Sequence, residues 1–191
     1  MNHLREKLIL ASSSPRRTEI LERAGWPHEI MIAGIDETVL PDENPAAYVQ
    51  RLARSKAEAV ASQLREGLVL GADTTVVVNN QILGQPRDEA DARRMLDLLN
   101  AKWHEVLTGV ALVRVGGETR VACETTRVRF AEMSGAEIDW YISTREPFGK
   151  AGAYGIQGKA ALFIEEIEGD YFNIMGLPIR LVYELTRVNA D

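Results

Sequence analysis

Short runs of consecutive apolar residues alternate along this chain with longer segments whose apolar residues recur at helical spacing. Residues 8–11 and 68–72 are short apolar runs typical of buried strands. Between them, residues 45–66 carry apolar residues every three or four positions, which predicts a helix packed by one face. Residues 106–115 and 119–130 flank a glycine pair and predict an antiparallel hairpin. The alternation predicts the α/β class, with a mixed central sheet and flanking helices.

Caps and turn residues predict the other elements. Residues 75–78 and 81–83 surround an Asn-Asn pair and predict a second hairpin, separate from the strand at 68–72. Residues 161–167 predict a further strand. Cap residues and prolines predict four more helices, which begin at Pro15, Asp88, Ser134 and Pro178.

Length and composition limit the classes of function. The chain has 191 residues, of which 46% are hydrophobic, and we expect one domain over residues 1–191, with two lobes at most. The 28 acidic and 22 basic residues give a net charge of −6, which argues against general binding to nucleic acid or anionic lipid. No apolar run is long enough for a signal peptide or a membrane span, so we expect a cytoplasmic protein. The single cysteine, Cys123, excludes an internal disulfide and is expected in the core.

Residues 12–17, Ser-Ser-Ser-Pro-Arg-Arg, form a turn between the first strand and the first helix. Hydroxyl groups and free backbone N–H groups at a helix N-terminus can bind an anion. Arg16 and Arg17 lie at the positive end of the helix dipole, which is unfavourable unless an anion such as phosphate compensates for them. On this segment alone, a helix capped by Ser14 with two solvated arginines is the simpler interpretation.

Lys56 and several acidic residues could form a second part of a site. Lys56 shares the apolar face of the helix at 45–66, so it either extends to solvent at the edge of that face or points to an anionic partner. Asp73 follows a buried strand at the edge where α/β sheets bind ligands, and Asp36-Glu37 precede the helix. Glu37 and Asp73 would suit Mg²⁺ or Mn²⁺ if substrate phosphates supplied further ligands. A surface loop and a turn-forming aspartate are the alternatives.

A glycine-rich segment at residues 149–158 allows close approach of the backbone to a ligand, or forms a flexible surface loop. Within it, Gln157 offers the hydrogen-bond donor and acceptor that recognition of a base edge requires. The three histidines, His3, His28 and His104, have no spacing typical of metal ligands and are expected to be surface or structural residues.

Three segments together resemble the Maf family of nucleoside triphosphate pyrophosphatases over nearly the whole chain. They are residues 12–17, the Gly-Ala-Asp-Thr at 71–74, and the Ala-Gly-Ala-Tyr-Gly-Ile-Gln-Gly at 151–158. The resemblance implies an elongated, two-lobed fold like that of inosine triphosphate pyrophosphatases and Ham1, with a central cleft. It also implies hydrolysis of nucleoside triphosphates to monophosphate and pyrophosphate, a divalent metal cation, Mg²⁺ or Mn²⁺, and commonly a homodimer.

The resemblance also assigns roles to the candidate residues. It makes Asp73 the catalytic proton acceptor, with Lys56 and Glu37 also catalytic and Glu37 and Asp73 holding the metal. The implied substrate-binding and specificity residues are Ser12, Ser14, Arg16, Arg17, Thr74 and Gln157. One departure is Gln85, where members of the family often have a lysine; Arg87 is the nearby cation that could replace it.

The residues Arg16, Thr74 and Gln157 resemble the branch of the family that acts on dTTP and UTP. A glutamine amide can partly match the acceptor, donor, acceptor edge of thymine or uracil, whereas methylated guanine would favour a carboxylate and an aromatic face. Two alternatives stay open. One is the same chemistry on 7-methyl-GTP or another modified nucleotide, and the other is a non-catalytic, nucleotide-binding regulator of cell division.

Overall fold

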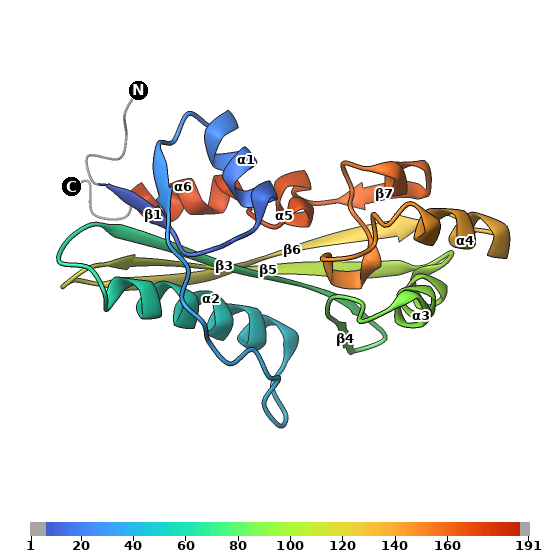
Figure 1. Cartoon of the computed structure of the whole chain (residues 1–191), viewed down its shortest axis with the longest axis horizontal. Helices are drawn as coiled ribbons and strands as arrows, with labels where there is room; N and C mark the ends of the chain where they lie inside the picture. Colours follow the sequence, from blue (N-terminus) through green and yellow to red (C-terminus); the bar gives the residue numbers. More distant parts are fainter. Residues whose placement is uncertain (1–6, 188–191) are drawn as a thin grey trace. The chain divides into compact units, whose positions relative to one another are not determined.

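The computed structural model of the chain describes residues 7–187 (Figure 1). Residues 1–6, with His3, lie outside the described part. The helices and strands in chain order are β1 (Leu8–Leu10), α1 (Pro15–Arg23), β2 (His28–Ile30), α2 (Pro45–Ala61), β3 (Leu68–Val78), β4 (Gln81–Leu83), α3 (Glu89–Leu99), β5 (Trp103–Arg114), β6 (Thr119–Phe130), α4 (Gly135–Ser143), β7 (Ile164–Glu168), α5 (Tyr171–Met175) and α6 (Ile179–Arg187). Among residues 7–187, no helix combines the length and apolar character that crossing a bilayer requires.

The strands form one mixed sheet, as expected from the sequence. Their order is β2-β1-β3-β5-β6-β7, and β4 pairs with β3. The strand β1 runs parallel to β2 and β3, whereas β4 is antiparallel to β3 and β7 is antiparallel to β6. With helices before and after most strands, this topology confirms the α/β class.

The chain divides into two compact units. Among the described residues, the first unit contains residues 7–73, 108–124 and 176–187, and the second contains residues 74–107 and 125–175. The long strands β3, β5 and β6 each contribute residues to both units. Each unit has its own apolar core.

In the first unit, α2 packs against one side of β3 and β5, with α1 and α6 on the other side (Figure 1). The buried side of α2 consists of Val49, Leu52, Ala53, Ala57 and Val60. Two strand glycines let the helix come close. A Cβ atom at Gly71 would lie 2.1 Å from the carbonyl oxygen of Ala53, and one at Gly109 would lie 2.2 Å from that of Val49. The backbone of α2 therefore lies directly on the sheet.

Two predicted boundaries are wrong. The helix predicted at 45–66 ends at Ala61, because the side chains of Ser62 and Gln63 both donate to the carbonyl oxygen of Ala59 and satisfy the last turn. Leu64 still packs against the core from outside the helix. The strands predicted at 68–72 and 75–78 are one continuous strand, β3, so Asp73 lies inside a strand and does not follow its end.

Other differences are smaller. The strand predicted at 161–167 is observed at Ile164–Glu168, because a 3₁₀ turn occupies Lys159–Leu162. Cys123 is half-buried in β6 and does not lie in the core. The short helix α5 had no clear signal in the sequence, because its five residues complete barely more than one turn.

The core of the second unit contains a buried histidine. His104 is 2% exposed, and its Nε2 lies 2.8 Å from the hydroxyl oxygen of Tyr154. The rings of Phe130 and Tyr154 pack edge-on against the imidazole. Burial lowers the pKa of His104 to about 4, so the folded protein holds this ring neutral.

Lowering the pH from about 7.5 to about 5 is expected to remove about 2 kcal/mol of folding free energy through His104. The unfolded chain binds a proton at this histidine below about pH 6.5, whereas the folded protein does not until about pH 4, so stability falls as the pH drops through this range. Urea unfolding at the two pH values measures the loss. The variant His104→Gln should lose less stability between them, and equal losses in both proteins would contradict the assignment.

Candidate active site

Lys56 joins two acidic residues in the first unit. Its Nζ lies 2.5 Å from Oδ1 of Asp73 and 2.8 Å from Oε1 of Glu37. The lysine side chain is 15% exposed and leaves α2 on the side that faces the sheet. Of the two interpretations of Lys56, the one with an anionic partner is therefore correct.

Asp73 is a buried carboxylate in the middle of β3. Its residue is 9% exposed, and burial raises its pKa, while Lys56 and Arg17 nearby act in the opposite direction. The net effect is a pKa above the ordinary value of an aspartate. A carboxylate of this kind holds a proton more readily than an exposed one, which suits a group that accepts a proton during a reaction.

Arg17 connects the first helix to the same region. Its side chain is buried, and it donates from Nε to the carbonyl oxygen of Gly176 at 2.8 Å and from Nη1 to Oγ of Ser12 at 2.9 Å. Burial lowers the pKa of Arg17, and the charge of Asp73 opposes that effect, so the two groups are electrostatically linked. The simpler interpretation of two solvated arginines is wrong for Arg17.

The serine-rich turn is arranged differently from an ordinary capped helix. Ser14 occupies the N-cap position of α1, but its side chain makes no capping hydrogen bond. Its backbone N–H instead donates to Oγ of Ser12 at 3.2 Å. Arg16 is half-buried, and burial lowers its pKa. The first turn of α1 therefore holds two desolvated cations where the helix dipole disfavours them.

The loop that carries Glu37 is fixed by residues that the sequence analysis missed. Arg51 binds both carboxylate oxygens of Glu43, at 2.5 and 2.7 Å, and donates to the carbonyl oxygen of Thr38 at 2.9 Å. The hydroxyl of Tyr48 donates to the carbonyl oxygen of Glu37 at 3.1 Å. Tyr48 and Arg51 lie on α2, as Lys56 does. One helix thus supplies both the lysine and the contacts that hold its acidic partner; the sequence offered only an ordinary helical Tyr-Arg spacing.

The remaining candidates belong to the second unit. Thr74 is half-buried in β3, and Gln157 is exposed in the glycine-rich segment. Gln85 is exposed, and Arg87 donates to Asp91 from a side chain that is 84% exposed. The first unit contains Ser12, Ser14, Arg16, Arg17, Glu37, Lys56 and Asp73.

Glu37 and Asp73 are the candidate metal ligands. Within residues 7–187, no three His, Cys, Asp or Glu side chains gather as a metal-binding group. The two carboxylates do converge on one cation, the ammonium group of Lys56. Mg²⁺ is commonly held by one or two carboxylates together with substrate phosphates and water, so this all-oxygen pair fits Mg²⁺ or Mn²⁺ when the phosphates complete the set.

Comparisons with known proteins show the family and the fold of this chain. A family model described as "Maf-like protein" matches residues 7–188. The dTTP/UTP pyrophosphatase of Symbiobacterium thermophilum is 52% identical over 183 residues, which are 95% of this chain and 94% of that protein. A dTTP/UTP pyrophosphatase of Bacillus cereus is 50% identical over 186 residues, 97% of each chain. The solved structure of the Staphylococcus aureus Ham1 protein aligns with a TM-score of 0.54 at 13% identity, covers 96% of this chain and 99% of that one, and is alike in fold.

Proposed function

Because this chain belongs to the Maf family, we propose that it is a nucleotide diphosphatase that hydrolyses dTTP and UTP to the monophosphate and pyrophosphate. Two relatives with about half of their residues identical carry the name of that activity. The observation that carries the proposal is the buried Asp73, in contact with Lys56 and electrostatically linked to Arg17. A base beside two cations suits hydrolysis of a polyanionic substrate.

The proposed reaction is attack of water on the α-phosphorus. Asp73 accepts the proton of the attacking water, the bond from the α-phosphorus to the bridging oxygen breaks, and its electron pair leaves with pyrophosphate. The raised pKa of Asp73 supports this role, because a general base works best when its pKa lies close to the pH of the reaction.

Cationic side chains would balance the charge of the triphosphate. Lys56, Arg16 and Arg17 lie in the first unit with Asp73, and such groups stabilise the negative charge that grows on the leaving pyrophosphate. Ser12 and Ser14 would orient phosphate oxygens through hydroxyl and backbone N–H groups at the start of α1. A substrate anion would also offset the cost of two arginines at the positive end of that helix.

Glu37 and Asp73 would hold a divalent cation, Mg²⁺ or Mn²⁺. When bound, the ion supplies further charge neutralisation on the phosphate oxygens. The clamp of Arg51 on Glu43 supports this assignment, because it fixes the loop from which Glu37 reaches toward Lys56. The proposal also includes a cytoplasmic homodimer that removes unwanted triphosphates from the nucleotide pool, on the family resemblance alone.

Release of pyrophosphate from a panel of triphosphates, with and without Mg²⁺ or Mn²⁺, tests the proposed function. We expect dTTP and UTP to have the highest kcat/KM and activity to require the metal. Preference for 7-methyl-GTP would support the proposed hydrolysis but would show that dTTP and UTP are not the main substrates. Saturable nucleotide binding without release of pyrophosphate would instead support the regulator of cell division.

The variant Gln157→Glu is expected to lower kcat/KM for UTP and dTTP relative to the other nucleotides of the panel by roughly tenfold. A carboxylate cannot donate a hydrogen bond to the carbonyl acceptors of uracil and thymine, whereas the amide of Gln157 can. The panel measures the change as a ratio, so a general loss of active protein cancels. Unchanged ratios would remove Gln157 from the specificity role.

A further inference from the structure

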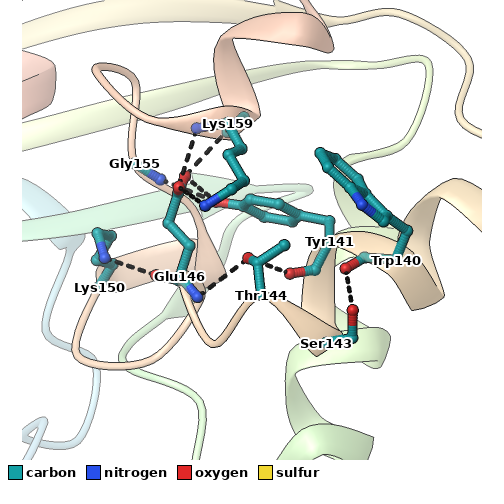
Figure 2. Close-up of polar contacts among 9 residues, drawn as sticks. Trp140, Tyr141, Ser143, Thr144, Glu146, Lys150, Gly155 and Lys159 are labelled. Atoms are coloured by element: carbon teal, nitrogen blue, oxygen red, sulfur yellow. Dashed lines mark hydrogen bonds and ion pairs between the residues drawn. The ribbon is translucent and has the colours of Figure 1, made fainter.

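A nearly buried carboxylate in the second unit anchors the backbone of the glycine-rich segment (Figure 2). The side chain of Glu146 is 14% exposed. Its Oε2 accepts from the backbone N–H of Lys159 at 2.9 Å, and its Oε1 accepts from that of Ala160 at 3.3 Å. Burial raises the pKa of Glu146, but these hydrogen bonds and that from Tyr141 outweigh burial and lower it overall, so the group is held ionised.

Tyr141 extends the anchor to the other side of the segment. Its hydroxyl donates to Oε1 of Glu146 at 2.9 Å and accepts from the backbone N–H of Gly155 at 3.3 Å. Burial and the neighbouring carboxylate raise the pKa of Tyr141, which keeps this hydroxyl protonated and able to donate. The backbone is therefore held two residues before Gln157 and two and three residues after it.

The backbone of the glycine-rich segment packs closely against the carboxylate of Glu146. A Cβ atom at Gly158 would lie 2.3 Å from Oε1 of Glu146, so only glycine fits there without movement. The ammonium group of Lys150 donates to the backbone carbonyl of Glu146 at 2.5 Å and holds the start of the segment as well (Figure 2). These contacts leave Gln157 as an exposed side chain on an anchored backbone.

We propose that Glu146 is a positioning residue for nucleotide selection. It holds the backbone directly at Lys159 and Ala160, and at Gly155 through Tyr141, and so fixes the orientation in which Gln157 presents its amide. This inference rests on the proposed function of the chain. A carboxylate removed from water requires several hydrogen bonds to offset its lost hydration, and Glu146 directs them to the residues that flank Gln157. An amide that reads a base edge discriminates well only when its backbone is fixed in advance.

The variants Glu146→Gln and Tyr141→Phe test the proposal. In Glu146→Gln, one carboxylate oxygen becomes an NH₂ group that faces a backbone donor, so one anchor is lost in a side chain of the same shape. We expect kcat/KM for UTP to fall about tenfold, mostly through KM, and the preference for UTP over other triphosphates to shrink. Tyr141→Phe, which releases Gly155, should shift the same ratios in the same direction.

Ser143→Ala is the matched control. Its hydroxyl donates to the carbonyl oxygen of Trp140 at the end of α4 and does not contact the glycine-rich segment (Figure 2). This variant should keep the nucleotide ratios of the wild-type protein. Hydrogen exchange gives a second readout, since the amides of Gly155, Lys159 and Ala160 should lose protection in Glu146→Gln while the amides of β3 keep theirs.

The outcomes separate this inference from the proposed function. A wild-type protein that releases no pyrophosphate from UTP or dTTP refutes the function, and the inference falls with it. If the wild-type protein selects UTP and dTTP and both variants keep its ratios, only the inference is overturned. The same holds if both variants lose kcat equally for every nucleotide, because Glu146 would then contribute to folding alone.

Discussion

Replacing Asp73 with asparagine is expected to lower kcat for UTP and dTTP by roughly 10²–10⁴-fold, because the amide cannot accept the proton of the attacking water. The substitution keeps the shape of the side chain inside β3, and Glu37 remains as an acidic partner for Lys56. The loss should therefore appear in kcat at saturating substrate, measured by release of pyrophosphate, and not in the amount of folded protein.

Asp97→Asn provides the matched control for Asp73→Asn. Asp97 is an exposed residue of α3 in the second unit, so the same chemical change there should leave both kcat and thermal unfolding unaltered. If Asp73→Asn kept the wild-type kcat on UTP, Asp73 would not be the proton acceptor, and the proposed mechanism would need another base.

The variant Lys56→Met is expected to lower kcat/KM by about 10²-fold and to move the acidic limb of its pH profile to higher pH. Lys56 lies beside Asp73 and would stabilise the charge that grows on the leaving pyrophosphate, and loss of one such group typically lowers the rate by about 10²–10³-fold. Lys56 lowers the pKa of Asp73, whose burial already raises it. Without the lysine the pKa of Asp73 rises further, so the carboxylate is ionised, and the enzyme active, only at higher pH.

Rates measured between about pH 5 and pH 9 would show the shift predicted for Lys56→Met. Arg54→Met is the control, because Arg54 lies on the exposed side of the same helix and pairs with Glu58, one turn further along. Lys56→Arg should recover part of the pH profile, since it restores a cation beside Asp73. An acidic limb that stays in place or moves to lower pH would show that Lys56 does not control the ionisation of Asp73.

Local patterns were sufficient to predict most of the fold. Apolar runs and helical periodicity indicated the α/β class and the positions of most elements, because burial of one face imposes these patterns on the sequence. They indicated boundaries less well. The helix α2 ends where Ser62 and Gln63 bind a carbonyl oxygen, and the continuity of β3 through Asp73 depends on pairing with distant strands. Such contacts leave no local periodic signal.

The candidate site was predictable where a residue violated a local rule. Lys56 lies on an apolar face and has the buried anionic partner that this violation indicates, Asp73. Arg17 lies at the positive end of a helix and is buried, with hydrogen bonds to the carbonyl oxygen of Gly176 and to Ser12, and the compensating phosphate stays a prediction. Arg51 and Glu146 violate no such rule. Each looks like an ordinary charged residue in the sequence, and only the folded chain brings Arg51 to the Glu37 loop and Glu146 to the backbone beside Gln157. Residues that hold functional groups in place were therefore missed.

The glycines beneath α2 have a consequence for how this chain can vary. Gly71 and Asp73 are two positions apart on β3 and so face the same side of the sheet, and the Cβ missing from Gly71 would strike Ala53 and Ala57, the residues around Lys56 on the helix. The absence of a side chain at Gly71 therefore sets the distance between α2 and β3, and with it the distance from the ammonium group of Lys56 to the carboxylate of Asp73. A methyl group at Gly71 would push α2 away from β3 and lengthen the contact between Lys56 and Asp73, although neither of these two residues would have changed.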